Sequence, residues 1–175
     1  METDEGSDEP PIDLQQTIQR LEVSDPQIQA ELARFDDQGH PDLRWGDYPW
    51  LLRKGSSRLY GVYVGGRLAA RMWLIETANS EGLGRRAQLR LHFLEVLPPY
   101  RSLGLGTLLV RFAQGFGLPM AVDALPGAED FYLRLGFAPV DGTGHKRNGW
   151  GERTFVWLPQ RAPVGEPVLR GATAR

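Results

Sequence analysis

The segment Arg101-Ser102-Leu103-Gly104-Leu105-Gly106-Thr107 decides the fold, because it joins two apolar stretches of different period. Before it, residues 87–97 (AQLRLHFLEVL) form a dense apolar run that Pro98 and Pro99 terminate, and this run predicts a long strand. After it, apolar side chains recur at helical spacing, at Leu105, Leu108, Leu109 and Phe112. They predict a helix over about residues 104–116, so the segment turns a strand into a helix.

A turn of this kind suits a phosphate group. Gly104 and Gly106 let the backbone come close to a ligand, and the first amides of the helix have no partners within it. An anion there meets free donors and roughly half a positive charge from the helix dipole. Arg101 adds a planar guanidinium that matches phosphate oxygens. On the loop alone, the alternative is a plain strand-to-helix connection whose glycines serve close packing.

Two other glycine motifs do not fit this chain. Leu109 stands where a dinucleotide-binding fingerprint places its third glycine, and the sequence has no mononucleotide loop with a lysine and a serine or threonine. Residues 61–66 have the glycine spacing of the second motif, but Arg67 and Leu68 follow, and a strand closed by a Gly65-Gly66 hairpin turn explains them better.

Two motifs together make the chain resemble the GNAT superfamily of acyl-CoA-dependent N-acyltransferases. The signature loop of that family is Arg or Gln, two residues, Gly, one residue, then Gly or Ala, and Arg101, Gly104 and Gly106 match it. The stretch Ala128-Glu-Asp-Phe131-Tyr132-Leu-Arg-Leu135-Gly136-Phe137 is similar to the family's late helix and the strand after it. The resemblance covers residues 58–140.

The resemblance implies an α/β fold of the α+β type. It has a central mixed, mostly antiparallel twisted sheet of six to seven strands, with helices on both faces and a splay at the acetyl-CoA site. We expect one acetyltransferase domain over residues 12–160, a disordered acidic tail over 1–11 and a flexible tail over 161–175.

The expected elements follow from period and turn signals. A helix over about residues 25–36 is predicted with Ser24 as its cap. The apolar residues around 17–23 have helical spacing, but the family has its first strand at this position, and we favour the strand. The remaining strands are expected at 58–64, 67–76, 120–124 and 152–158, with a loop at 79–84 and a short helical turn near the end of 36–54.

For acetyl-CoA, the resemblance implies a binding site along the long strand and the loop. The pyrophosphate is expected at Arg101, Ser102, Leu103, Gly104, Leu105, Gly106 and Thr107. Leu94 and Val96 would offer main-chain groups to the pantetheine, and Tyr132 would lie beside the coenzyme. Many members have an asparagine where Leu125 stands, so this chain lacks one pantetheine contact.

The implied reaction is direct attack of an amine on the thioester, which requires a proton acceptor because an alkyl amine has a pKa near 10.4. In a regular strand residues 90, 92 and 94 share one face, so His92 is the first candidate base. Glu95, acting through water, is the second candidate if a bulge changes its direction. A core histidine is the alternative interpretation of His92.

Tyr132 is the candidate general acid, because the family's tyrosine at this place protonates the departing thiolate of the coenzyme. The alternative is that Tyr132 only packs beside the coenzyme. Phe131, Leu135 and Phe137 are expected in the core.

The acceptor pocket is expected to involve aromatic side chains, at Trp45, Tyr48, Trp50 and Trp150. They would stack on an arylalkyl or similar amine, although ordinary packing explains each of them equally well. A small molecule, a peptide N-terminus and a protein lysine all remain open as acceptor.

Composition narrows the class of protein. The chain has no cysteine, which excludes disulfides, zinc–thiolate sites and a cysteine nucleophile, and we expect no metal. A net charge of −2 gives no footprint for nucleic acid, and no apolar run approaches ~18 residues. We therefore expect a cytoplasmic N-acetyltransferase, monomeric or homodimeric. The alternatives are a non-catalytic acyl-CoA-binding module and a toxin-like aminoacyl-tRNA acetyltransferase, which would require a basic face.

Overall fold

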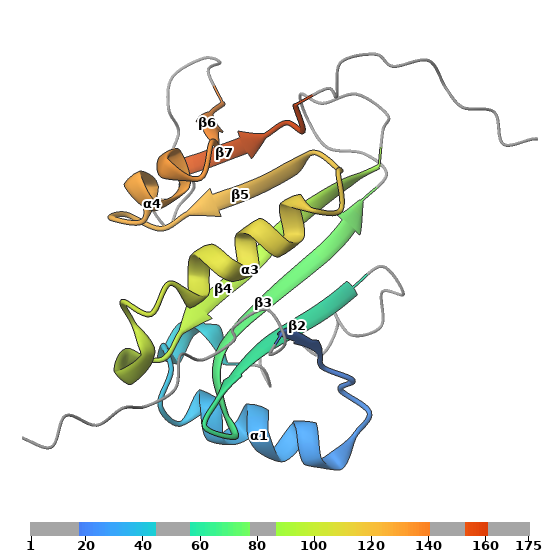
Figure 1. Cartoon of the computed structure of the whole chain (residues 1–175), viewed down its shortest axis with the longest axis vertical. Helices are drawn as coiled ribbons and strands as arrows, with labels where there is room; N and C mark the ends of the chain where they lie inside the picture. The colour runs from blue at the N-terminus through green and yellow to red at the C-terminus, as the bar shows by residue number, and fades with distance from the viewer. Residues whose placement is uncertain (1–17, 45–56, 78–86, 141–152, 161–175) are drawn as a thin grey trace, which may run out of the picture.

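The computed structural model describes residues 18–44, 57–77, 87–140 and 153–160. Within them the strands form one seven-stranded sheet in the order β1-β2-β3-β4-β5-β7-β6, in which only β4 and β5 pair in parallel (Figure 1). The strands are β1 (Ile18–Arg20), β2 (Ser57–Val64), β3 (Arg67–Thr77), β4 (Gln88–Val96), β5 (Met120–Ala124), β6 (Ala138–Pro139) and β7 (Arg153–Trp157). The expected mixed, mostly antiparallel sheet is confirmed.

Helices cover both faces of the sheet. The α-helices are α1 (Pro26–Asp36), α3 (Leu105–Gln114) and α4 (Glu129–Arg134), with short 3₁₀ turns η2 (Pro41–Leu43) and η4 (Pro98–Tyr100). Figure 1 shows α3 and α4 on the face toward the viewer. The packing of Leu32 and Phe35 from α1 against Trp73 of β3 places α1 on the other face.

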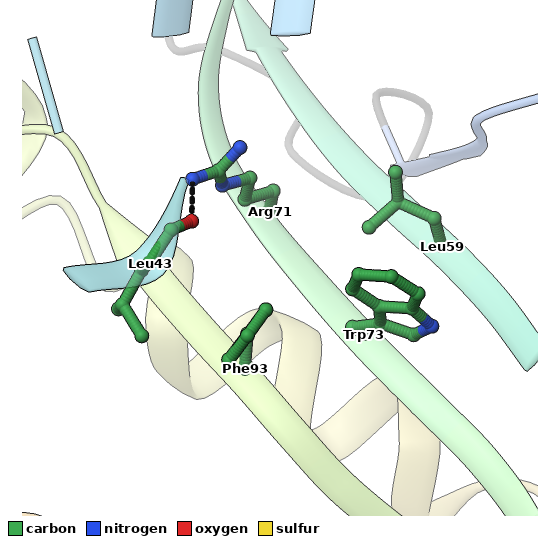
Figure 2. A pocket seen from close by; sticks show the side chains of 5 residues that line it. All are labelled: Leu43, Leu59, Arg71, Trp73 and Phe93. Atoms are coloured by element: carbon green, nitrogen blue, oxygen red, sulfur yellow. Dashed lines mark hydrogen bonds between the residues drawn. The ribbon is translucent and has the colours of Figure 1, made fainter. Parts of the chain in front are cut away.

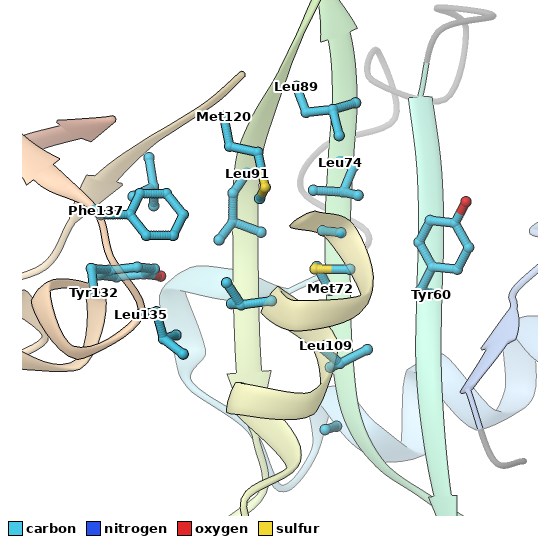
Figure 3. Close-up of a cluster of buried hydrophobic side chains, with 14 of the residues drawn as sticks. Tyr60, Met72, Leu74, Leu89, Leu91, Leu109, Met120, Tyr132, Leu135 and Phe137 are labelled. Carbon is cyan, nitrogen blue, oxygen red and sulfur yellow. The ribbon is translucent and has the colours of Figure 1, made fainter. Parts of the chain in front are cut away.

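The larger core lies under α3 and α4 (Figure 3). Met72 and Leu74 of β3 pack there with Leu109 of α3, and all three are fully buried. Each such side chain contributes about 1.5–3 kcal/mol of transfer free energy. The two faces of β3 therefore serve two cores, which explains why its sequence is a continuous apolar run rather than an alternating one.

The element boundaries differ little from those expected. α1 is capped by Asp25, whose side chain accepts the Gln27 N–H at 2.8 Å, so the prediction of Ser24 as cap was wrong. Pro26 takes the first helical position, where a missing N–H costs nothing. Residues 18–20 form a strand, as favoured over a helix. The predicted loop at 79–84 and both predicted tails lie outside the described residues.

The parallel pairing of β4 with β5 is short. It runs from Leu89↔Met120 to Leu91↔Val122, whereas β4 continues along β3 as far as Ala70↔Val96. Figure 1 shows β4 and β5 diverging toward their arrowheads. Beyond Leu91 the described part of β5 offers β4 no partner, so the expected splay is present beside the signature loop.

A β-bulge lies in β4 at the start of this splay. Trp73 pairs with Phe93 and Leu74 with Leu91, so His92 is the extra residue. Because of the bulge, Leu94 lies on the α3 face beside Met72, but Arg90 pairs with Ile75 on the α1 face. The expectation that residues 90, 92 and 94 share one face was wrong, since it assumed a regular strand.

Candidate active site

The signature loop presents its backbone to solvent in an anion-binding form. Ser102 and Gly104 both adopt left-handed conformations, with φ of 77° and 75°, and α3 begins directly after them. Alternating left-handed residues at a helix start turn successive N–H groups into one concavity. A side chain at Gly104 would meet no atom within 4 Å, so the concavity is open.

Gly106 has a different role. A Cβ at this position would lie 3.4 Å from the Phe131 ring and 3.7 Å from the Val96 side chain, so α3, α4 and β4 approach closely there. Leu105 is buried beneath the loop, whereas Arg101, Ser102, Leu103 and Thr107 are exposed.

The predicted coenzyme residues therefore gather at one place, the end of β4 and the start of α3. Leu94 and Val96 lie on the splayed part of β4, and Arg101 donates from Nε to the Val96 carbonyl at 3.3 Å. The open loop amides are able to bind a pyrophosphate, and the unpaired main-chain groups of the splayed strand are able to bind an amide-bearing arm. The residues present thus fit coenzyme A.

Tyr132 lies in the apolar core of the same face. Its ring packs against Phe131, Phe137 and Phe155, at centroid distances of 5.0, 5.5 and 6.5 Å, and the residue is 7% exposed. Figure 3 shows the Tyr132 ring reaching from α4 with its hydroxyl end toward β4 in this view. Burial raises the pKa of Tyr132 well above its ordinary value, so the phenol stays protonated at neutral pH.

His92 is half-buried at the bulge and belongs to the opposite side of the sheet. Its ring centroid lies 4.5 Å from that of Phe93 and 6.1 Å from that of Trp73, and both neighbours pack on the α1 face. The candidate base and the candidate acid therefore lie on opposite faces of the sheet.

The second candidate base, Glu95, is engaged by neighbouring groups. It is 7% exposed and accepts from the Arg71 guanidinium at 3.0 Å and from the His40 backbone N–H. Arg71 also binds the Leu43 carbonyl at 2.6 Å. Sequence reasoning did not identify Arg71, although a charged residue inside the apolar run LAARMWLI was the available signal.

Next to these groups is a small hollow on the α1 face, lined by Leu43, Leu59, Arg71, Trp73 and Phe93. Figure 2 shows Trp73 and Phe93 facing it from neighbouring strands, with Arg71 bound to the Leu43 carbonyl at its edge. The predicted acceptor residues Trp45, Tyr48, Trp50 and Trp150 lie outside the described residues.

Comparison with known proteins agrees with this geometry. The model of the acetyltransferase (GNAT) family matches residues 18–137. An uncharacterized N-acetyltransferase of Shouchella clausii is 35% identical over 149 residues, covering 82% of this chain and 88% of the relative. The chain belongs to the GNAT acetyltransferase family, and it is accordingly an acyltransferase with acetyl-CoA as co-substrate.

Solved structures of the same fold include the Bacillus subtilis N-acetyltransferase YlbP in complex with coenzyme A. It superimposes with a TM-score of 0.59 at 28% identity, covering 81% of this chain and 95% of that one. The AtaTR complex bound with acetyl-CoA gives a TM-score of 0.57 at 23% identity, covering 81% and 91%, which shows a shared fold. In the described part of the chain, no helix combines the length and apolarity needed to cross a membrane.

Proposed function

We propose that this chain transfers the acetyl group of acetyl-CoA to a primary amine of a small molecule or peptide by direct attack. The observation that carries the proposal is the parting of β4 and β5 beside the amide nest at Ser102 and Gly104. Tyr132 lies on the α3 face of the sheet, and the rings that contact His92 lie on the α1 face. We expect the protein to act in the cytoplasm as a monomer or homodimer.

The proposed reaction needs two proton transfers, one by His92 and one by Tyr132. The amine nitrogen forms a bond to the thioester carbonyl carbon while the carbon–sulfur bond breaks. His92 takes the proton that the amine must lose, and Tyr132 gives a proton to the departing thiolate. Both residues then exchange protons with solvent. General acid or base catalysis of this kind contributes about 10²–10⁴-fold.

Of the two candidate bases, we favour His92. An imidazole with an ordinary pKa near 6.5 is largely neutral at pH 7 and is able to accept a proton. Glu95 acting through water is the second possibility, but its carboxylate already accepts from Arg71 and from the His40 N–H.

Burial keeps the Tyr132 hydroxyl protonated, so it has a proton to give, although the raised pKa also makes the phenol a weaker acid. A thiol with a pKa near 8.5 is a tolerable leaving group even unaided, so the hydroxyl assists rather than enables its departure.

A non-catalytic acyl-CoA-binding module is the second candidate function. It is supported by Leu125, which is 44% exposed at the end of β5 where many family members carry an asparagine for the pantetheine. An aminoacyl-tRNA acetyltransferase has less support, since the net charge of −2 offers no general attraction for nucleic acid.

Titration calorimetry with acetyl-CoA tests the proposal, using Gly104→Glu as the disrupted variant and Gly117→Glu as its control. Both glycines have positive φ, 75° and 68°, and at neither would a Cβ meet an atom within 4 Å. The backbone strain is therefore matched, and only Gly104→Glu puts a negative charge into the phosphate nest.

We expect affinity on the order of micromolar for the wild type and Gly117→Glu, and no measurable binding for Gly104→Glu. Binding without acetylation of any amine would favour the non-catalytic module. Absence of binding to the wild type would refute the proposal.

A further inference from the structure

Arg71 of β3 is the most buried of the basic side chains that the structure describes, at 2% exposure. Its guanidinium lies 2.6 Å from an oxygen of Asp36 at the end of α1 and 3.0 Å from Glu95 of β4. It also donates to the Leu43 carbonyl at 2.6 Å, and its central carbon lies 4.4 Å from the centre of the Phe35 ring. One cation thus joins β3, β4, α1 and η2.

The other oxygen of Glu95 completes this network. It accepts the backbone N–H of His40, and a Cβ at Gly39 would lie only 2.7 Å from it. Residues 39–43 are therefore tied to the sheet at two backbone points, the His40 N–H and the Leu43 carbonyl. None of the residues of η2 is fully buried, and Leu43 is half-buried, so the two backbone bonds add to limited apolar packing in holding this segment.

The tied segment forms part of the hollow beside the candidate base. Leu43 lines the hollow together with Trp73 and Phe93 (Figure 2). The same two aromatic rings contact His92, at centroid distances of 6.1 and 4.5 Å. A shift of residues 39–43 would therefore disturb the two rings against which His92 packs.

Stability alone is a poor explanation for such a network. Replacing a buried ion network by apolar side chains of similar volume is often neutral or stabilising, because the desolvation of the charges is costly. An apolar trio, however, is unable to bind a backbone N–H and a backbone carbonyl in fixed directions. The planar fork of arginine, with several donors in one geometry, does so.

We propose that Arg71 and Glu95, with Asp36, are positioning residues for the amine acceptor, which they serve by fixing residues 39–43 as a wall of the hollow next to His92. This inference rests on the proposed acetyl transfer. It assigns the Glu95 carboxylate to binding Arg71 and His40 and leaves the proton transfer to His92.

Steady-state kinetics tests the proposal with Arg71→Lys, Glu95→Gln and the double variant Arg71→Met/Glu95→Met. The double variant removes the charges of both Arg71 and Glu95, so neither is left buried without the other, while Asp36, with a side chain 15% exposed, loses its cation. Arg58→Met is the control, because Arg58 of β2 forms an ion pair of similar length with Glu76 of β3, at 3.1 Å, but a half-exposed one away from residues 39–43. Tyramine, kanamycin and a short peptide with a free N-terminus serve as acceptors, with release of coenzyme A as the signal.

We expect the network variants to lower kcat/KM for the acceptor by about 10- to 100-fold, mainly through KM. The acetyl-CoA Kd and the acid limb of the pH–rate profile should stay as in the wild type, and Arg58→Met should behave as the wild type throughout. Loss of the acid limb in Glu95→Gln would make Glu95 the base and overturn the proposal. An unchanged acceptor KM in the double variant would overturn it as well.

Amide hydrogen exchange provides a second test that needs no acceptor amine. With acetyl-CoA bound, exchange over residues 37–44 should become at least about tenfold faster in the double variant and stay unchanged in Arg58→Met. Unchanged exchange would contradict the anchoring of the segment. Failure of the proposed function would give a different result. The wild type would bind no acetyl-CoA or acetylate none of the amines, while slow exchange over residues 37–44 would still show that the segment is anchored.

Discussion

At the scale of single residues, Tyr132 combines burial with a place beside the splay. Replacing it by phenylalanine removes one hydroxyl and leaves the ring packing against Phe131, Phe137 and Phe155 in place. We expect kcat to fall about 10- to 1,000-fold while acetyl-CoA binding is retained, because a thiolate departs less readily without a proton donor.

Tyr60→Phe is the matched control for this measurement. Tyr60 is also 7% exposed and lies in the same core, but it belongs to β2, away from the splay, where it packs against Phe112 of α3. Turnover and calorimetric binding are measured for both variants. Equal turnover in Tyr132→Phe and Tyr60→Phe would remove Tyr132 from the mechanism and leave it a packing role.

At the scale of elements, a polar bridge connects three strands just before β4 and β5 part. Asp123 of β5 pairs with Arg90 of β4, and its other oxygen accepts from Thr154 of β7 at 2.7 Å. Asp123 directly follows Val122, the last residue of β5 that pairs with β4. The bridge therefore fixes the point at which the gap for the pantetheine begins.

Asp123→Asn should weaken acetyl-CoA binding several-fold while costing no more than about 1 kcal/mol of stability, because the ion pair is partly exposed and screened. Glu76→Gln, in the similarly exposed Arg58–Glu76 pair, should have the same small effect on urea unfolding and none on acetyl-CoA binding. Equal affinities in the two variants would show that the bridge has no part in shaping the gap.

The elements were more predictable from sequence than the side-chain geometry. Period and turn signals indicated β2, β3, β4 and α3 to within two residues, because each buries a continuous apolar face. The sequence around His92 carries no signal for the bulge. In a bulge two residues of one strand lie opposite one residue of the next, so its position depends on β3 as well as on β4. The Arg71 network depends on groups far apart in sequence, at Asp36, Leu43 and Glu95, so spacing gave no indication of it.

At the scale of the whole molecule, the sheet consists of two antiparallel parts that meet at the short parallel seam. The first is β1-β2-β3-β4 and the second is β5-β7-β6, and α3 connects them along the chain. A coenzyme that binds at the divergent end of this seam contacts both parts. It should therefore raise the stability of the entire fold by mass action, about 2.7 kcal/mol at 100 times Kd.

The charge composition makes the alkaline stability of the molecule a test of its buried tyrosines. Only Lys54 and Lys146 are lysines, so few side chains other than tyrosine titrate near pH 10. The pKa of Tyr132 is raised by burial, and that of Tyr63 is raised by partial burial and by its hydrogen bond to Glu31. Above the ordinary tyrosine pKa, the unfolded chain loses phenolic protons that the folded chain keeps.

The sign of the effect follows from this difference in bound protons. Because the folded state binds more protons than the unfolded state, the free energy of unfolding falls as pH rises above about 10 and is unaffected by these groups below it. Tyr132 contributes a slope of about 1.4 kcal/mol per pH unit, whereas the more exposed Tyr63 contributes less. Urea unfolding from about pH 8 to 11 should therefore show a fall that is shallower in Tyr132→Phe than in the wild type. If the wild type and Tyr132→Phe lose stability with the same slope, the Tyr132 phenol ionises as readily in the folded as in the unfolded chain. Its assignment as a buried, protonated acid then does not hold.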